Sequence, residues 1–116
     1  METSKPELTG MIQSLDEVLA ARKAADPSSS YTAKLFSKGL PKILAKVVEE
    51  ASETYEAAHE TDGTDHLVYE VADLWFHSMV LLHHKGRTGT DVLAELARRF
   101  GTSGIDEKNS RTKESQ

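Results

Sequence analysis

The segment between residues 65 and 84 constrains this chain more than any other part of its sequence. On a helix with about 100° per residue, its apolar side chains cover nearly the whole circumference. A helix that is apolar on almost every side is expected to be buried on almost every side. Glu70, Asp73 and His77, spaced i, i+3 and i+7, nevertheless share one strip of this helix, roughly 60° wide. Like charges in such a setting cost several kcal/mol unless a cation stands opposite them.

Turn signals divide the rest of the chain into further helices, and no strand pattern competes with them. Pro41 opens a second long helix, expected over about 41–60, because proline suits the first helical turn. The turn-rich connection 61–64 is of the short kind that joins antiparallel neighbours. Shorter helices are expected over 15–25 with Ser14 and Glu17 as a capping box, over 31–37 after a Ser30 cap, and from Thr90 or Asp91 to about 100.

Length and composition fit a single small all-α domain. The chain has 116 residues, of which 38% are apolar, so one core is possible but stability is tight. We expect a helical bundle built on the two long antiparallel helices with shorter flanking helices, completed by dimerisation that buries the remaining apolar face. Residues 1–10 are expected to form a flexible leader, 11–100 the domain, and 101–116 a polar, partly disordered tail.

Charge, cysteine content and hydropathy exclude several functions. The 19 acidic and 14 basic side chains give a net charge of −5, which argues against a nucleic-acid or acidic-membrane surface. The chain has no cysteine, so disulfides, thiolate zinc sites and thiol catalysis are excluded. No signal-peptide pattern is visible, and Glu70 and Asp73 interrupt the longest apolar stretch, so no membrane span is expected. We expect a cytoplasmic protein.

The first long helix supplies further carboxylates. Glu49 and Glu53 lie on its polar face, whereas Glu50 lies at the edge of its apolar stripe. If the two long helices are antiparallel neighbours, Glu50 and Glu53 face Glu70 and Asp73. The opposing cation is then a Lys or Arg of the protein, a shared proton or a metal. A strongly negative, all-oxygen site suits Mg²⁺, with Mn²⁺ as the alternative, because zinc prefers His and Cys.

Several segments resemble a known enzyme family. The motifs EEASE at 49–53 and EVAD at 70–73 are similar to the paired motifs of the all-α (MazG-like) nucleoside triphosphate pyrophosphatases. More narrowly, the chain resembles the phosphoribosyl-ATP pyrophosphohydrolases of histidine biosynthesis, over about residues 12–111. The segments that carry this likeness are SYTAKLF at 30–36, KILAKVVEEA at 42–51, LVYE at 67–70, DVLAEL at 91–96 and the stretch from Arg98 to Lys108.

The resemblance implies a reaction, a cofactor and an assembly. The reaction is hydrolysis of phosphoribosyl-ATP to phosphoribosyl-AMP and pyrophosphate, the second step of L-histidine biosynthesis, by attack of water at the α–β phosphate linkage. The resemblance also implies Mg²⁺ and an obligate homodimer. By motif position, Glu50, Glu53, Glu70 and Asp73 would be the metal ligands. Glu49 and Glu50 are the expected catalytic carboxylates, Glu49 being a further ligand or the base that orients the attacking water.

Basic side chains are candidates for contacts with the substrate phosphates, because the chain has no glycine-rich phosphate loop. The candidates are Lys34, Lys38 and Lys46 on the expected helices, and Lys108 and Arg111 in the tail. An ordinary solvated surface is the alternative for each of them. His77 either binds metal or packs behind the ligands, and Tyr31 is a candidate for stacking on adenine. Packing in the core or in a dimer is the favoured interpretation of Trp75, Phe76 and Met79.

Two rival functions remain. The first is a house-cleaning pyrophosphatase that acts on (d)NTPs with the same carboxylates, and the segment at 30–36 favours the histidine-pathway enzyme over it. The second is a non-catalytic helical dimerisation module whose acidic strip docks a basic partner. The second alternative predicts no magnesium binding and leaves the buried setting of Glu70 unexplained.

Overall fold

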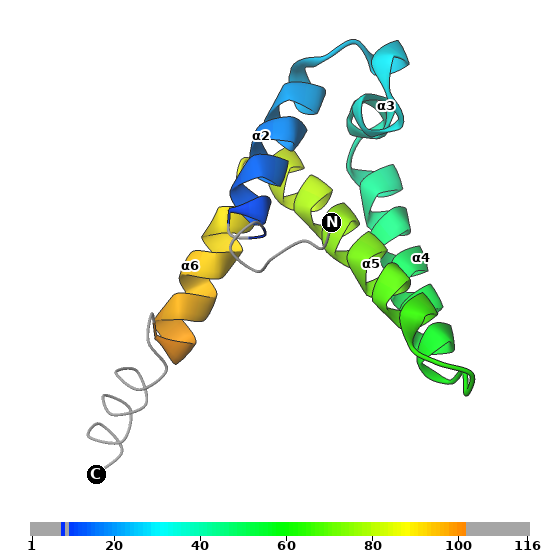
Figure 1. Cartoon of the computed structure of the whole chain (residues 1–116). Helices are drawn as coiled ribbons and strands as arrows, with labels where there is room; N and C mark the ends of the chain where they lie inside the picture. The colour runs from blue at the N-terminus through cyan, green and yellow to red at the C-terminus, as the bar shows by residue number, and fades with distance from the viewer. Residues whose placement is uncertain (1–7, 9, 102–116) are drawn as a thin grey trace.

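The structure is a computed structural model, and it describes residue 8 and residues 10–101. It consists of α2 (Met11–Ala24), the short 3-10 helix η1 (Pro27–Ser29), α3 (Tyr31–Lys38), α4 (Leu40–Ala58), α5 (Asp65–His84) and α6 (Gly89–Phe100) (Figure 1). No strand occurs in this described part, so the expected all-α class is confirmed. None of the described helices is both long and apolar enough to cross a membrane. The expected leader and tail fall almost entirely outside the described residues, and those boundaries stay predictions.

The two long helices α4 and α5 pack against each other and run in opposite directions (Figure 1). α5 has the bounds expected from its sequence, while α4 ends at Ala58, slightly before its expected end near residue 60. The backbone N–H groups of His59 and Glu60 donate to the carbonyls of Glu56 and Ala57, which tightens the last turn and ends the helix. The link over residues 59–64 is short, and the two helices therefore stay in contact.

The N-terminal helix α2 begins earlier than its sequence pattern indicates. Gly10 is its N-cap, with a backbone φ of 87°, and Met11 is its first residue. The expected capping box of Ser14 and Glu17 is wrong, because the Ser14 N–H donates to the Gly10 carbonyl at 2.9 Å within the helix. The earlier start brings Ile12 against the core. This apolar contact favours an additional turn over a side-chain cap at Ser14.

Side-chain caps set the start of two other helices. Ser30 caps α3 as expected, and its hydroxyl accepts from the Ala33 N–H at 3.0 Å. Thr88 and Asp91 form a capping box at the start of α6, which satisfies two N–H groups that the helix itself leaves unpaired. α6 consequently begins at Gly89, just before the expected Thr90 or Asp91.

The hydrophobic core lies where α2, α3, α4 and α5 meet. Its buried members are Leu19, Leu35, Phe36, Ile43, Met79 and Val80, with Ile12, Leu15, Phe76 and Leu81 packed against them. Full burial of an apolar side chain of this kind stabilises the fold by about 1.5–3 kcal/mol. Because all four helices contribute, the short helices α2 and α3 hold the α4–α5 pair in place.

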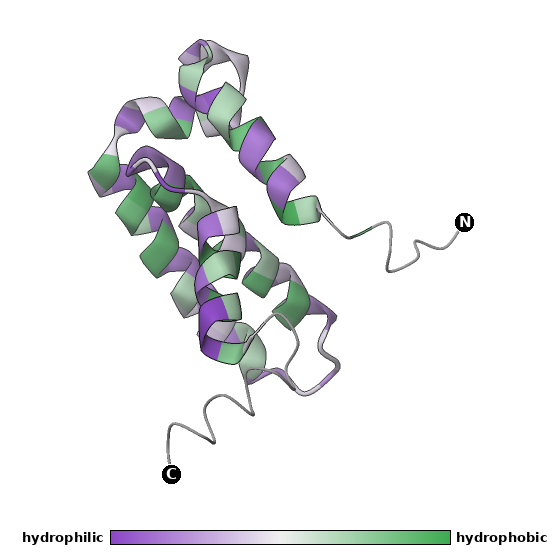
Figure 2. Cartoon of the chain, turned by 90° about the vertical axis from the view of Figure 1, so that its left-hand side faces the viewer, coloured by the Kyte–Doolittle hydropathy of each residue, from purple (hydrophilic) through white to green (hydrophobic). Residues whose placement is uncertain are grey.

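The apolar pattern of residues 65–84 predicts that α5 is buried on almost every side, but both long helices have exposed apolar side chains. Trp75 on α5 is 64% exposed and Val48 on α4 is 69% exposed, and Leu44, Tyr55 and Val68 are exposed as well. Coloured by hydropathy, the helices show green, apolar segments between purple ones along most of their length (Figure 2). The expectation of burial on almost every side is therefore wrong for one chain, because a single chain has too few helices to cover these faces.

Candidate active site

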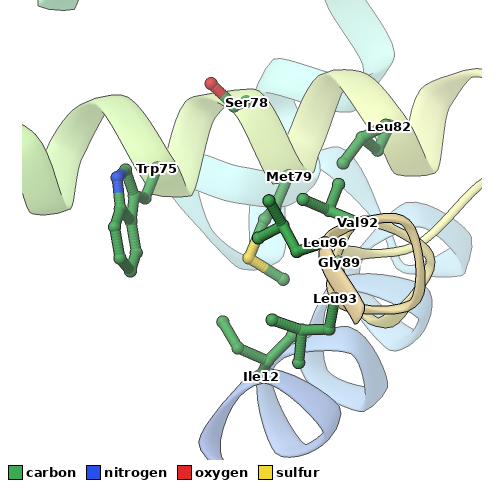
Figure 3. A pocket seen from close by; sticks show the side chains of 9 residues that line it. All are labelled: Ile12, Trp75, Ser78, Met79, Leu82, Gly89, Val92, Leu93 and Leu96. Atoms are coloured by element: carbon green, nitrogen blue, oxygen red, sulfur yellow. The ribbon is translucent and has the colours of Figure 1, made fainter. Parts of the chain in front are cut away.

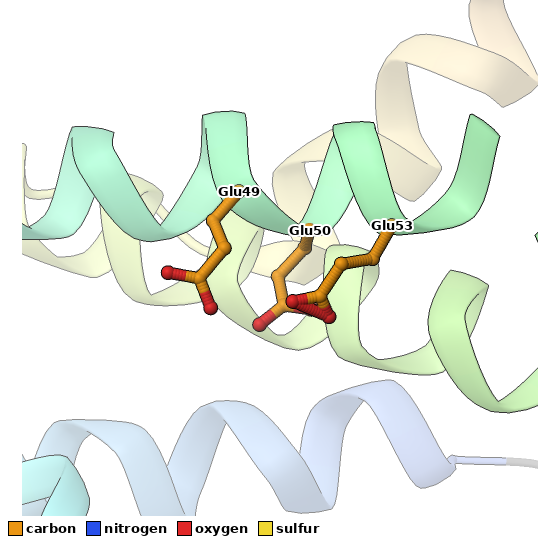
Figure 4. A group of neighbouring side chains, drawn as sticks. All are labelled: Glu49, Glu50 and Glu53. Carbon is orange, nitrogen blue, oxygen red and sulfur yellow. The ribbon is translucent and has the colours of Figure 1, made fainter. Parts of the chain in front are cut away.

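Carboxylates of α4 and α5 converge where the two helices pack. One carboxylate oxygen from each of Glu50, Glu70 and Asp73 lies within 4.8 Å of the others, and the same holds for Glu49, Glu50 and Glu53. Glu50 belongs to both groups. Figure 4 shows the second group leaving α4 on one side, with the carboxylates of Glu50 and Glu53 next to each other. The structure thus brings together the acidic residues that the sequence singles out, and we call them the carboxylate cluster.

Helical spacing and helix packing produce this arrangement. Glu70 and Asp73 are one turn apart on α5 and therefore project from the same face. Glu50 and Glu53 are likewise one turn apart on α4. Glu50 is 4% exposed and Glu70 is 6% exposed, because each lies at the edge of the face that packs against the other helix. Two acidic side chains are thus held almost out of reach of water.

Positively charged or polar groups of the protein approach one oxygen of each buried carboxylate. Lys46 Nζ lies 2.9 Å from Glu49 Oε2 and 3.6 Å from Glu50 Oε1. His66 Nε2 lies 2.9 Å from Glu70 Oε2, and its Nδ1 lies 2.9 Å from an oxygen of Glu60. Lysine and histidine therefore offset part of the negative charge of the cluster.

The other oxygen of each buried carboxylate has no hydrogen-bond partner in the described residues. These atoms are Glu50 Oε2 and Glu70 Oε1, both fully buried. Leaving a buried charged oxygen unpaired costs more than the usual 1–3 kcal/mol for a neutral group, so such atoms indicate a missing partner. A divalent cation fits this requirement, since all the available donors are carboxylate oxygens, the ligands that Mg²⁺ and Mn²⁺ prefer.

The local electrostatics agree with an excess of negative charge. Partial burial raises the pKa of Glu53, and the neighbouring carboxylates of Glu50, Glu70 and Glu49 raise it further. The hydrogen bond to Glu49 raises the pKa of Lys46 in spite of partial burial. Both shifts follow from acidic groups crowded into one place, and a bound cation would relieve the repulsion between them.

Comparison with known proteins decides the family. Over residues 12–100 the chain matches the family described as phosphoribosyl-ATP pyrophosphohydrolase. The chain belongs to this family. A phosphoribosyl-ATP pyrophosphatase from Hydrogenovibrio crunogenus is 55% identical over 102 residues, covering 85% of this chain and 90% of the relative. Relatives of the same name from an Azoarcus species and from Neisseria gonorrhoeae are 60% and 52% identical, covering 80% and 88% of this chain and 86% and 94% of the relatives.

Membership in the phosphoribosyl-ATP pyrophosphohydrolase family confirms the resemblance that the motifs at 49–53 and 70–73 carry, and with it the expected hydrolase class. Both motifs lie inside the matched span. They are also the two segments that meet in the carboxylate cluster. The roles of the individual carboxylates remain predictions.

The basic candidates for phosphate contacts lie in different places. Lys46 belongs to the carboxylate cluster through its pairs with Glu49 and Glu50. Lys34 and Lys38 are exposed on α3, and within residues 10–101 no ion pair joins them to the cluster. Lys108 and Arg111 lie outside the described residues. Lys46 is therefore the basic candidate that the structure places nearest to the buried carboxylates.

Two polar residues near the packed helices were not anticipated from the sequence. His66 lies one turn before Glu70 on α5, a spacing that could have indicated the pair. Asp16 lies three residues before Leu19, on the same face of α2, and both are buried. In the sequence, an aspartate on the apolar face of a helix is a comparable signal. Asp16 is remote from the motifs of the carboxylate cluster and has a structural role.

Asp16 links three helices through hydrogen bonds. Its Oδ1 accepts from His83 Nε2 at 2.8 Å and from the Gly89 N–H at 2.7 Å. Its Oδ2 accepts from the N–H of Thr90 at 2.9 Å and from the Thr90 hydroxyl at 2.7 Å. Burial alone would raise the pKa of Asp16, but the hydrogen bonds from His83, Thr90 and Gly89 outweigh it and lower the pKa to about 2.

An apolar groove of about 300 Å³ lies between α2, α5 and α6. Figure 3 shows Trp75 and Met79 of α5 on one side of it, with Leu93 of α6 and Ile12 of α2 on another. Its lining is almost entirely apolar, so it lacks the polar groups with which a nucleotide phosphate would be bound. The groove is therefore a packing surface rather than part of the carboxylate cluster.

Proposed function

We propose that this chain hydrolyses phosphoribosyl-ATP to phosphoribosyl-AMP and pyrophosphate, the second step of L-histidine biosynthesis. The observation that carries the proposal is the pair of buried, unpartnered oxygens of Glu50 and Glu70 inside a carboxylate cluster. This cluster belongs to a member of the phosphoribosyl-ATP pyrophosphohydrolase family. The relatives that carry the name phosphoribosyl-ATP pyrophosphatase support the choice of substrate.

Mg²⁺ is the cation that we propose for this site, with Mn²⁺ as a substitute. Glu50, Glu53, Glu70 and Asp73 would hold it, because their carboxylates are grouped and two of them have an oxygen without a protein partner. When bound, the cation supplies positive charge that offsets the charge of the triphosphate and makes the α–β linkage easier to break. Substrate phosphate oxygens would supply further ligands, because Mg²⁺ is usually held by a few carboxylates together with phosphate oxygens.

Glu49 is the residue that we assign to the attacking water. It is more exposed than Glu50, and its Oε2 is held by Lys46 at 2.9 Å. Its Oε1 accepts a hydrogen bond from the water and orients the water in line with the α–β linkage. As the new phosphorus–oxygen bond forms, pyrophosphate leaves and the water proton passes to Glu49 Oε1. Lys46 meanwhile balances the charges of Glu49 and Glu50.

We also propose that the enzyme works as a homodimer. Leu44, Val48 and Tyr55 share one side of α4, and α5 exposes Val68 and Trp75. Exposed apolar residues in such numbers on two helices indicate an interaction surface. A second copy of the chain is the occupant that fits, because self-association buries the apolar faces that one chain leaves uncovered.

Pyrophosphate release from phosphoribosyl-ATP and from a panel of (d)NTPs, with and without Mg²⁺, tests the proposal. We expect Mg²⁺-dependent release, with phosphoribosyl-ATP preferred over every (d)NTP. Glu70→Gln and Asp73→Asn, which keep the shape but remove the charge, should lower the rate by about a hundredfold or more. Glu17→Gln, at an exposed glutamate of α2, is the matched control and should leave the rate unchanged.

The same measurement separates the rival functions. Equal turnover of ordinary (d)NTPs would favour a house-cleaning pyrophosphatase, which uses the same carboxylates with a different base and ribose pocket. Absence of metal-dependent turnover with any nucleotide would favour the non-catalytic dimerisation module. In that case the chain should tolerate Glu70→Gln and Asp73→Asn as well as it tolerates the control substitution Glu17→Gln.

A further inference from the structure

His77 is a buried histidine of α5 that the proposed mechanism does not use. It is 5% exposed, yet both of its ring nitrogens have partners. Nδ1 lies 3.0 Å from the carbonyl oxygen of Asp73 and 3.8 Å from Glu50 Oε1. Nε2 lies 3.1 Å from the hydroxyl of Tyr31. A line of polar contacts thus runs from Tyr31 on α3, through His77, to a carboxylate of α4.

The partners of Nδ1 determine where the ring carries its hydrogen. A backbone carbonyl only accepts hydrogen bonds, so the Nδ1 atom that lies 3.0 Å from the Asp73 carbonyl carries the hydrogen. In a neutral imidazole the lone pair is then on Nε2, and the Tyr31 hydroxyl donates to it. The hydroxyl of Tyr31 therefore stabilises one tautomer of His77, the one with hydrogen on Nδ1.

Tyr31 is held in the position that this bond requires. It is the first residue of α3, directly after the Ser30 cap, so the helix start fixes its backbone. Its ring meets the His77 ring edge-on, with centroids 6.2 Å apart and planes at 85°. Phe76 packs edge-on against the same histidine, with centroids 5.1 Å apart. Although Tyr31 as a whole is exposed, its hydroxyl joins α3 to His77 by a hydrogen bond.

We propose that Tyr31 and His77 are a positioning pair for Glu50. The Tyr31 hydroxyl stabilises the tautomer of His77 that has its hydrogen on Nδ1. This N–H donates to the Asp73 carbonyl and places its positive end 3.8 Å from Glu50 Oε1, so that it attracts this oxygen, while Oε2 is the oxygen without a partner. With the hydrogen on Nε2, a lone pair on Nδ1 would face the Asp73 carbonyl, and Glu50 Oε1 would lose the attraction of the nearby N–H. The inference rests on the proposed function, because Glu50 is one of its carboxylates.

The tautomer of His77 can be read without any substrate or metal. Long-range ¹H–¹⁵N correlation spectra of the full chain distinguish the two tautomers, and the His77 signals are those that vanish in His77→Asn. We expect the Nδ1–H form in the wild-type protein and a larger share of the Nε2–H form in Tyr31→Phe. A wild-type ring that carries its hydrogen on Nε2, or on both nitrogens, would overturn the inference.

Kinetics with phosphoribosyl-ATP and Mg²⁺ test the consequence for Glu50. Tyr31→Phe removes one hydroxyl and should lower kcat by about threefold to tenfold, the usual effect of one lost hydrogen bond, while KM changes by less than about twofold. Tyr69→Phe, at another exposed tyrosine, should leave both unchanged. A rise in KM with kcat intact would assign Tyr31 to substrate contact instead, and a wild-type kcat in Tyr31→Phe would remove the positioning role.

A double-mutant cycle shows whether Tyr31 acts through His77. In His77→Asn, an amide N–H lies near the position of Nδ1, and the amide needs no partner on α3. Tyr31→Phe should therefore cause no further loss of kcat in the His77→Asn protein. Additive losses in kcat would contradict this. If the wild-type protein releases no pyrophosphate at all, the proposed function fails, whereas the spectra still decide whether the pair exists.

Discussion

His83 on α5 donates a hydrogen bond from Nε2 to Oδ1 of Asp16 on α2, at 2.8 Å and across 67 residues of sequence. The same carboxylate accepts from the first two N–H groups of α6, those of Gly89 and Thr90. A negative charge at this position is also favoured by the dipole of α6. One buried side chain thus fixes α2, α5 and the start of α6 relative to one another.

Replacing Asp16 by asparagine should destabilise the fold. The amide has a single accepting oxygen and no charge, so at least two of the present hydrogen bonds are lost inside a buried site. We expect a loss of about 2–4 kcal/mol in the free energy of unfolding, measured by urea denaturation followed by circular dichroism. Glu17→Gln, at the exposed neighbouring residue, is the control. Equal midpoints for the two variants would contradict the structural role of Asp16.

Acid should remove the contribution of Asp16 in a defined range of pH. Its pKa is lowered from 3.8 to about 2, because the hydrogen bonds from His83, Thr90 and Gly89 outweigh the effect of burial. A carboxyl with a lowered pKa stabilises the folded state fully above about pH 4 and loses this effect as the pH falls through about 2. The difference in unfolding free energy between the wild type and Asp16→Asn should therefore shrink by about 2 kcal/mol over this range. A constant difference would show that the carboxyl is not responsible.

His66 should matter for metal binding although it is not a proposed ligand. It holds Glu70 Oε2 at 2.9 Å, so that Oε1 is the oxygen left without a partner. Partners that orient a ligating carboxylate are worth about tenfold or more in metal affinity. We expect His66→Gln to weaken Mg²⁺ binding by about tenfold in calorimetric titrations, with the helix content intact. His59→Gln is the control, because the His59 ring bonds to the backbone of its own helix. Equal affinities would remove His66 from the site.

A charge on the exposed apolar faces should shift the proposed dimer towards monomers. Trp75→Lys and Val48→Lys each place an ammonium group where an apolar side chain is now exposed. Loss of one such apolar contact is worth about 2–3 kcal/mol, which weakens association by about a hundredfold. Sedimentation equilibrium measures the change directly. Val18→Lys, on the exposed side of α2, should leave association unchanged. A wild-type protein that stays monomeric at high concentration would contradict the proposed assembly.

Local pattern was enough to predict the long helices and the residues that meet between them. The bounds of α5 follow from its hydrophobic periodicity and the turn signals at either end, and they agree with the structure. Glu50 was distinguished from Glu49 by its place beside the apolar stripe, and the structure buries Glu50 and exposes Glu49. Helical geometry predicts which side chains share a face over one or two turns, and the residues of each motif are spaced within that distance.

Contacts between distant segments could not be predicted in the same way. Asp16 and His83 meet only because α2 packs across α5, and neither residue has a local signal that names the other. The start of α2 was missed for a related reason, since Ile12 gains its partners from the core rather than from its own helix. Trp75, for which packing in the core and packing in a dimer were both open, is exposed in one chain. Apolar periodicity indicates that a helix face is to be covered, but not whether the same chain supplies the covering residues.

Glu50 is a member of both three-carboxylate groups, and this sharing links the two halves of the cluster. A positive charge that enters one half weakens the attraction that the other half exerts on a second one, because the same carboxylate contributes to both potentials. Binding of one divalent ion in this cluster would therefore weaken the binding of a second one. A titration with a divalent ion alone should accordingly spread over a wider range of concentration than two independent sites of equal affinity would give.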